Sequence, residues 1–327
     1  MGDAASISIN DFSTLYTLFE HDHLIRNMTW LLERLSKNSG CGSVKVGYDR
    51  ACWTRDTNKD NTFCVAEIIE MIQLLIGESY IKAFGKNFRQ IKGIIMGGKC
   101  SGWLSDCSLM VDEFKYIDKI VKNGDLVLAH KFKGLNRYRD DCTALNIDDF
   151  RTLAQDIYPP SLELSQENDD MSQAAVLDMF VSVRDGYFKT KVYNKTDSFP
   201  FNVVSMPFLE SNISLKVCYK VFFSQVLRYQ RLCSFKHDFE DRVYSLGKSL
   251  EERGYKMDKL GKEFRQVVSN YRSEFERWDI PINSLSWFTS IFANPSDIPP
   301  PSRLTNITPF SQPTTINTEI RFVTLSQ

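Results

Sequence analysis

The stretch Tyr138-Arg139-Asp140-Asp141 decides how the rest of this chain is interpreted. Its two adjacent aspartates stand between the short apolar segments of residues 134–147, at the point where a β-hairpin would turn. Because neighbouring carboxylates repel each other, folding alone gives little reason to place them together. A divalent cation removes this cost, since hard cations take carboxylate oxygens as ligands. The alternative is a solvated surface turn, because aspartate is a common turn former.

A second pattern lies near the beginning of the chain. The apolar segment 7–16 reads as a strand that runs into a turn, and it carries Asp11 with the aromatic Tyr16 five positions later. This spacing is compatible with a carboxylate presented at a strand end beside an aromatic wall. The alternative is an aspartate that simply caps the following helix.

A third pattern is the glycine-containing stretch 90–101, QIKGIIMGGKCS, which runs directly into an amphipathic helical segment. Glycines allow the backbone to approach a ligand closely, and a helix N-terminus favours an anionic group. The alternative is an ordinary strand-to-helix turn capped by Ser101.

The three patterns follow one another in the order of motifs A, B and C of the right-handed palm polymerases. The sequence resembles reverse transcriptases, and specifically those of animal retroelements of the Penelope-like and non-LTR-related groups. The resemblance runs from Asp11 to about Tyr271. Besides the motifs, it includes the segments 85–97, 174–178 and 190–208, the last of which is similar to the segment around the primer grip.

The resemblance implies an α+β fold, with a reverse-transcriptase-like palm of the ferredoxin-like split βαβ type followed by a helical thumb. The palm is expected over residues 1–215, with motif A near 11, motif B at 93–102, motif C at 138–141 and a hairpin with the primer-grip-like segment at 174–208. The thumb-like region is expected over 216–280. A Pro/Ser/Thr-rich tail over 281–327, with six prolines between Pro295 and Pro313, is expected to be disordered.

The resemblance also implies residue roles. Asp11, Asp140 and Asp141 are expected to be the catalytic carboxylates and to hold two Mg²⁺ ions, for which Mn²⁺ is a possible substitute. The backbone carbonyl of Phe12 would be an added ligand. Such ions activate a primer 3′-hydroxyl and stabilise the leaving pyrophosphate.

Nucleotide contacts are implied at three further positions. Tyr16 occupies the place of the aromatic gate that excludes a ribose 2′-hydroxyl. Met96 and Gly97 fall where the motif B loop contacts the incoming nucleotide and the templating pair. The expected partners are therefore deoxynucleoside triphosphates and an RNA or DNA template with its primer, while a membrane partner is not expected.

The sequence departs from the family pattern in motifs B and C. Ile95 replaces a proline of the motif B loop, and the usual Ser-Pro has become Ser101-Gly102, so this loop is expected to be less rigid. Arg139 stands where an apolar residue is common. Arg137 lies two positions before it, and both arginines are compatible with a role in offsetting the charge of the aspartates.

Only ten residues precede Asp11, whereas the fingers of the family, which grip the triphosphate, lie upstream. The resemblance therefore implies a chain without its fingers, which puts polymerase activity of the chain alone in doubt.

Composition limits the remaining interpretations. Hydrophobic residues make up 43% of the 327 residues and the net charge is −1, so a nucleic-acid surface must be a local patch. Residues 216–277 carry fourteen Lys/Arg and nine Asp/Glu, a local net charge of +5. This count fits a basic helical bundle that binds a duplex, and it also fits an ordinary mixed-charge helical surface. The eight cysteines show no metal-binding spacing, and we assign none of the four histidines a catalytic role.

Local patterns predict several elements. Helices are expected at about 65–76, from Trp103 to Val121 and at 148–157, and from about 219 to 277. Two short strands are expected within 81–96, around Gly85, and two longer ones at 174–183 and 187–193, with Asp185-Gly186 in the turn between them. No signal peptide and no membrane-spanning run are visible, so an intracellular location, nuclear or cytoplasmic, is expected.

Three functions remain open. The first is an RNA-directed DNA polymerase module of a mobile element. The second is a degenerate or domesticated copy that binds nucleic acid without catalysis, which the altered motif B favours. The third is a metal-dependent nuclease, which has less support because a nuclease needs neither the aromatic Tyr16 nor a basic thumb.

Overall fold

The computed structural model describes residues 4–57, 60–201, 203–281, 284–293 and 322–324. The chain divides into two compact units. The sheet unit comprises Ser8–Asp169 and Pro313–Gln327, and the helical unit comprises Met1–Ile7 and Asp170–Gln312.

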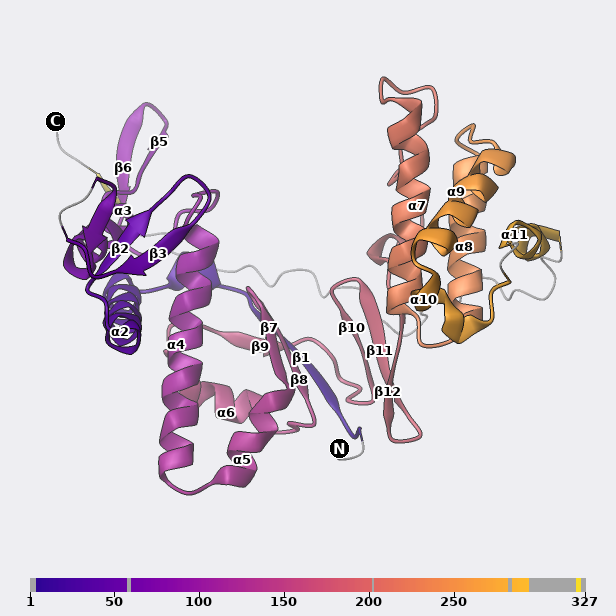
Figure 1. The fold of residues 1–327 in the computed structure, drawn as a ribbon. Coiled ribbons are helices and arrows are strands. Elements are labelled where there is room, and N and C mark those ends of the chain that lie inside the picture. Colours follow the sequence, from indigo (N-terminus) through magenta and orange to yellow (C-terminus); the bar gives the residue numbers. More distant parts are fainter. Residues whose placement is uncertain (1–3, 58–59, 202, 282–283, 294–321, 325–327) are drawn as a thin grey trace. The chain divides into compact units, whose positions relative to one another are not determined.

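The sheet unit is built on a four-stranded sheet with the order β7-β8-β1-β9 (Figure 1). Its strands are β1 (Ile7–Phe12), β7 (Leu135–Tyr138), β8 (Asp141–Leu145) and β9 (Leu164–Gln166). The long helix α4 (Ser101–Lys122) lies between β1 and β7 in the sequence, and α6 (Phe150–Ile157) lies between β8 and β9. This strand order and helix placement is the βαββαβ arrangement of ferredoxin-like sheets that we expected.

Apolar residues from β1, β8, α4 and α6 form the core of the sheet unit. Phe12, Leu109, Cys142 and Phe150 are all nearly or fully buried in one cluster. Strand β8 contributes Cys142 and Ala144 to the core, because side chains alternate along a strand and these two are buried between half-buried neighbours. Short segments complete the unit around this core: α1 (Leu15–Leu18), α5 (Leu126–Lys131) and the 3₁₀ turn η1 (Phe132–Gly134).

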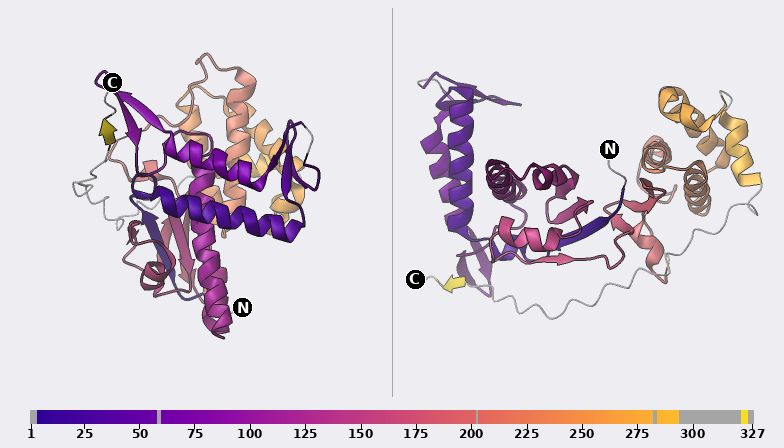
Figure 2. Two further views of the ribbon diagram at one scale, coloured as in Figure 1. Left: turned by 90° about the vertical axis from the view of Figure 1, so that its left-hand side faces the viewer. Right: turned by 90° about the horizontal axis from the view of Figure 1, so that it is seen from below.

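The chain between β1 and α4 forms a layer of its own. It contains α2 (His21–Ser39), β2 (Ser43–Val46), β3 (Ala51–Thr54), β4 (Thr62–Cys64), α3 (Val65–Gly77), β5 (Tyr80–Ala83) and β6 (Lys86–Gln90). Helices α2 and α3 lie side by side (Figure 2). The predicted helix at 65–76 and the predicted strands around Gly85 are confirmed. The three-stranded sheet β3-β2-β4 was not expected.

The helical unit combines a small sheet with a helical bundle. The sheet is β10 (Gln173–Val176), β11 (Met179–Arg184) and β12 (Tyr187–Val192), and the bundle contains α7 (Leu215–Leu232), α8 (Lys236–Glu251), α9 (Met257–Asn270) and α10 (Arg272–Phe275). Two 3₁₀ turns, η2 (Lys195–Ser198) and η3 (Glu276–Trp278), complete it. The single strand expected at 174–183 is in fact two strands, because the chain turns at Leu177, whose φ is 51°.

The boundary between the two units lies between Asp169 and Asp170, and the expected end of the palm at residue 215 stays a prediction. Residues 170–215 belong with the helices, because Val192 is part of the helical core and the Thr190 carbonyl accepts a hydrogen bond from the Ser234 amide. The Arg242 guanidinium likewise donates to the Val192 carbonyl. Side-chain packing, which is not visible in local patterns, therefore decides this boundary.

The expected tail also contains ordered elements. Helix α11 (Ser284–Ala293) packs on α9 through the side chains of Leu285 and Phe288, which lie so close to Gly261 that a Cβ there would meet Leu285 at 2.6 Å. Strand β13 (Phe322–Thr324) pairs antiparallel with β6. The tail residues 282–283, 294–321 and 325–327 lie outside the described part of the chain. Among the described residues, no helix has the length and apolar character needed to cross a membrane.

Candidate active site at the ends of strands β1 and β8

The β7–β8 hairpin brings Asp140 and Asp141 next to Asp11. Tyr138 pairs with Asp141, so Arg139 and Asp140 form the turn. The Phe12 amide donates a hydrogen bond of 3.1 Å to the Asp140 carbonyl, which joins the turn to the end of β1. The predicted hairpin at 134–147 is confirmed, and the sheet order places the strand of Asp11 beside the hairpin of Asp140 and Asp141.

The electrostatics of Asp11 reflect these neighbours. Its side chain is half-buried, and burial together with the negative charges of Glu167, Asp140 and Asp141 raises the pKa of Asp11 to about 6. Each of these causes disfavours the charged carboxylate. The charges that raise this pKa are those of carboxylates, and the expectation that Arg139 offsets the charge of Asp140 and Asp141 stays a prediction.

Sequence reasoning missed Glu167. This residue directly follows β9, and its amide donates to the Ile9 carbonyl at 2.8 Å, so it faces the strand that carries Asp11. Glu167 affects the pKa of Asp11 more than either aspartate of the hairpin does. A carboxylate just beyond the strand 164–166 was the available signal, but only the antiparallel pairing of β9 with β1 brings it to Asp11.

Carboxylates in mutual repulsion are a donor set of the kind that Mg²⁺ or Mn²⁺ takes. Nevertheless, no group of three or more His, Cys, Asp or Glu side chains within the described residues is arranged as a metal site. The donor chemistry of the three aspartates therefore fits a hard cation, while their described positions do not form a metal site. The Phe12 ring is buried against Tyr158, with centroids 4.8 Å apart, so this residue can offer the site only its backbone.

The glycine loop is attached to the short helix α1, which carries Tyr16. The Ile94 amide donates to the Tyr16 carbonyl at 2.8 Å, and the Gly93 amide donates to the Phe19 carbonyl at 2.7 Å. His21 adds a 2.8 Å contact from its ring nitrogen to the Gly93 carbonyl. A Cβ on Gly93 would lie 2.5 Å from the Tyr16 carbonyl oxygen, so only glycine allows this approach.

Further along the loop, the two predicted nucleotide contacts are open to solvent. The Met96 side chain is 73% exposed, and Gly97 has a φ of 89° with open space around it. No contact of either residue with the three aspartates is present among the described residues. The structure therefore links Tyr16 to the start of the loop, while the roles of Met96 and Gly97 stay predictions.

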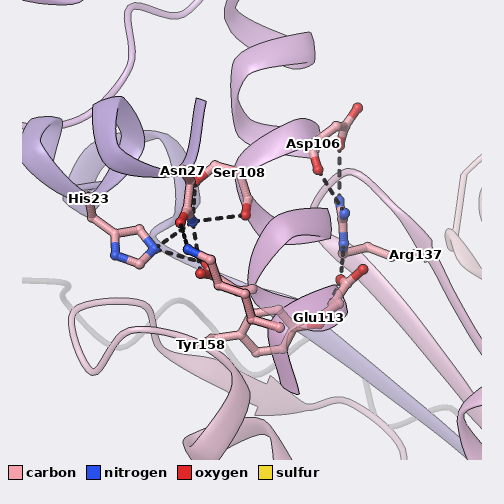
Figure 3. A network of polar contacts seen from close by, with 9 residues as sticks. His23, Asn27, Asp106, Ser108, Glu113, Arg137 and Tyr158 are labelled. Atoms are coloured by element: carbon pink, nitrogen blue, oxygen red, sulfur yellow. Dashed lines mark hydrogen bonds and ion pairs between the residues drawn. The ribbon is translucent and has the colours of Figure 1, made fainter. Parts of the chain in front are cut away.

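A buried arginine connects the hairpin to α4 (Figure 3). The Arg137 guanidinium, 9% exposed, binds Glu113 at 2.7 Å and Asp106 at 3.0 Å, and it also donates to the Arg139 carbonyl at 3.3 Å. The Tyr158 hydroxyl donates to Glu113 at 2.9 Å. Arg137 therefore pairs with carboxylates of α4, and its role is to position the turn.

A second polar network joins α2 to α4 (Figure 3). The Asn27 amide nitrogen donates to Asp112 at 2.8 Å and to Ser108, and its oxygen accepts from Lys115 at 2.8 Å. The His23 ring nitrogen lies 2.9 Å from Asp112. Because α2 begins at His21 and α4 begins just after the glycine loop, this network fixes the two helices that flank the loop.

The helical unit offers one candidate surface for nucleic acid. Many of its cations are neutralised by carboxylates, as in the pairs Lys220–Glu263, Arg228–Asp178, Arg231–Glu274, Arg242–Asp197 and Lys248–Glu251. Helix α9 carries a hollow without carboxylates, lined by Lys262, Arg265, Gln266, Ser269 and Asn270. Within the described part of the chain, Lys262 and Arg265 form no ion pair, so their charges are available to a partner.

No protein-family model matches this sequence, and no curated protein matches it either. The structure is similar to telomerase from Candida albicans, solved in complex with a TWJ fragment of telomeric RNA, with a TM-score of 0.55 and 13% identity. The similarity covers 88% of this chain and 46% of that one, so the chain spans less than half the length of that telomerase.

Two Candida tropicalis telomerase structures, one without RNA and one with the TWJ fragment, match at TM-scores of 0.40 and 0.38, too low to indicate a shared fold. Their identities are 12% and 13%, over 89% and 88% of this chain and 49% and 46% of theirs. The chain thus has a mixed helix and strand fold similar to that of a telomerase, an enzyme related to the reverse transcriptases.

Proposed function

We propose that this chain is the palm and thumb module of a reverse transcriptase, an RNA-directed DNA polymerase of a Penelope-like or related retroelement. The observation that carries the proposal is the 3.1 Å hydrogen bond from the Phe12 amide to the Asp140 carbonyl. This contact joins the end of β1 to the hairpin turn, where the charges of Asp140 and Asp141 repel that of Asp11. The likeness of the fold to a telomerase supports the same class of enzyme. The mobile-element origin rests on the sequence resemblance.

In this proposal, Asp11, Asp140 and Asp141 hold two Mg²⁺ ions, with the Phe12 carbonyl as a further ligand. When bound, such ions lower the pKa of the primer 3′-hydroxyl and neutralise charge on the transferred phosphate. With a pKa of about 6, Asp11 is mostly ionised at neutral pH, and a bound cation would relieve the carboxylate repulsion that adds to burial in raising this pKa. Tyr16 forms one wall of the nucleotide site, and the loop attached to it through Gly93 presents Met96 and Gly97.

The helical unit is proposed to bind the primer–template duplex. Phosphate contacts dominate such binding, and the α9 hollow supplies two cations with no carboxylate among its lining residues. A protein of this kind needs no base contacts here, because the template specifies sequence by pairing.

A second candidate is a copy that binds nucleic acid without catalysis. Two observations favour it: the carboxylates do not converge as a metal site within the described residues, and motif B carries Ile95 and Gly102 in place of prolines. Both candidates predict duplex binding, so only metal binding and nucleotide incorporation separate them.

The test combines Mn²⁺ binding, followed by electron paramagnetic resonance, with primer extension on RNA and DNA templates. The polymerase proposal expects saturable Mn²⁺ binding that Asp11→Asn and Asp140→Asn both reduce at least tenfold, and it expects both variants to abolish any extension that the wild type supports. Thr143→Ala on β8 is the matched control and should change neither. Duplex binding without Mn²⁺ binding would favour the non-catalytic copy, and the absence of both would contradict the two candidates.

A further inference from the structure

Two departures from the family pattern lie against each other. Gly102 is the second residue of α4, and Arg139 is in the turn between β7 and β8. A Cβ added to Gly102 would meet the Arg139 guanidinium, with 3.5 Å to Cζ, 3.5 Å to Nη1 and 3.7 Å to Nη2. The proline that the resemblance places at this position has a ring of further carbons beyond Cβ, which leaves less room for the arginine.

The Arg139 guanidinium is available for a ligand. Arg139 is exposed. Within the described ranges, its guanidinium forms no hydrogen bond and no ion pair. Arg137, two residues earlier, has its guanidinium occupied by Glu113 and Asp106. The hairpin thus presents one cation that supports the fold and one that does not.

Folding alone does not favour arginine at position 139. Its φ is 59°, in the left-handed region, where a residue with a Cβ is strained and glycine is not. The carbonyl of the same residue is held by Arg137 at 3.3 Å, so the turn cannot easily move to a relaxed conformation. A strained, unpaired arginine beside a candidate site is therefore a functional candidate.

We infer that Gly102 and Arg139 form one phosphate-binding element of this site. Gly102 leaves the space in which the guanidinium lies against the first turn of α4, and the guanidinium binds a phosphate of the strand or nucleotide handled by the adjacent aspartates. The planar guanidinium suits this task because it donates two parallel hydrogen bonds to phosphate oxygens. The inference rests on the proposed function, from which it takes the identity of the ligand.

The spatial coupling is tested by thermal unfolding of Gly102→Pro, Arg139→Met and the double variant. Proline is tolerated in the first turn of a helix. Any loss of stability in Gly102→Pro should therefore come from the clash of the proline ring with Arg139. Gly102→Pro is expected to lower the melting temperature when Arg139 is present and to leave it unchanged or raise it when Arg139→Met is already in place. Additive effects of the two changes would contradict the coupling.

Phosphate binding is tested with the full chain and a labelled primer–template duplex over a range of salt concentrations. Arg139→Met should weaken binding about tenfold and reduce the slope of log affinity against log salt by about 0.7–0.9, the value for one lost phosphate contact. Lys133→Met is the matched control and should leave the slope unchanged. It removes an exposed cation that lies just before the first residue of β7, away from the turn at Arg139.

A nucleotide phosphate as the ligand gives a different result. Binding of a deoxynucleoside triphosphate to the chain–duplex complex would then weaken about tenfold in Arg139→Met, while the duplex salt slope would stay the same. If wild type binds the duplex and Arg139→Met changes neither measurement, the inference is wrong and the proposed function stands. If wild type binds no nucleic acid, both are wrong.

Arg139→Gly separates function from folding. Glycine relieves the left-handed conformation and removes the guanidinium, so the melting temperature should rise or stay constant while phosphate binding falls. A variant that lost stability and binding together would indicate that Arg139 supports the fold, which contradicts the inference.

Discussion

The backbone amide of Phe12 donates a hydrogen bond to the carbonyl of Asp140, and this contact joins two motifs that lie far apart in the sequence. It puts Asp11 at the end of one strand beside a turn that carries two more carboxylates. The resulting repulsion is unfavourable for the folded chain and favourable for a bound cation. Stability measurements with and without a divalent cation therefore test whether these carboxylates bind one.

Asp11→Asn should stabilise the chain at neutral pH without added metal. The pKa of Asp11 is 3.8 in an unfolded chain and about 6 in the folded one. A carboxyl with a raised folded pKa stabilises fully below about pH 4, and this contribution is lost as the pH rises through about 6. The melting temperature of wild type relative to Asp11→Asn should therefore fall between these pH values. A constant difference over this range would show that Asp11 is not perturbed.

Gly93→Ala should destabilise the sheet unit by about 2–5 kcal/mol. The left-handed φ of 85° costs an alanine about 1–2 kcal/mol, and the contact of its Cβ with the Tyr16 carbonyl adds about 1–3 kcal/mol of overpacking. Gly97→Ala is the matched control, because Gly97 has a similar φ of 89° and nothing within 4 Å. In urea unfolding, Gly97→Ala should lose only the free energy that the left-handed φ costs. Equal losses in both variants would contradict the close approach of Gly93 to the Tyr16 carbonyl.

Arg137→Met should be among the most destabilising single changes in the sheet unit. It leaves Glu113 without its cation in a mostly buried position, and breaking such a pair costs about 3–5 kcal/mol. Lys122→Met, which breaks the exposed i,i+4 pair with Asp118, should cost less than about 0.5 kcal/mol. Similar unfolding midpoints for the two variants would contradict a positioning role for Arg137.

Lys262→Met with Arg265→Met should weaken duplex binding and lower its salt slope by about 0.9 for each lost phosphate contact. Lys248→Met is the control, because Lys248 is already paired with Glu251 at 2.9 Å. Fluorescence anisotropy at several salt concentrations provides the measurement. An unchanged slope in the double variant would mean that the α9 hollow does not contact the duplex.

Local patterns were sufficient for the elements that depend on near neighbours. Apolar residues on one face specify α4, and a segment that is apolar nearly all round and ends at a glycine specifies α3. The hairpin at Tyr138–Asp141 followed from short apolar segments around polar turn residues. The order of Asp11, the glycine loop and the double aspartate was also readable, since it is a property of the chain itself.

Only the tertiary structure decided which of these elements meet. The sheet order joins β1 to β8 and β9, and this pairing alone brings Glu167 to Asp11. The assignment of residues 170–215 to the helical unit and the packing of α11 on α9 depend on side chains that are distant in sequence. The contact between Gly102 and Arg139 is of the same kind. A one-dimensional pattern records spacing along the chain, whereas burial, close approach and Coulomb repulsion depend on distance through space.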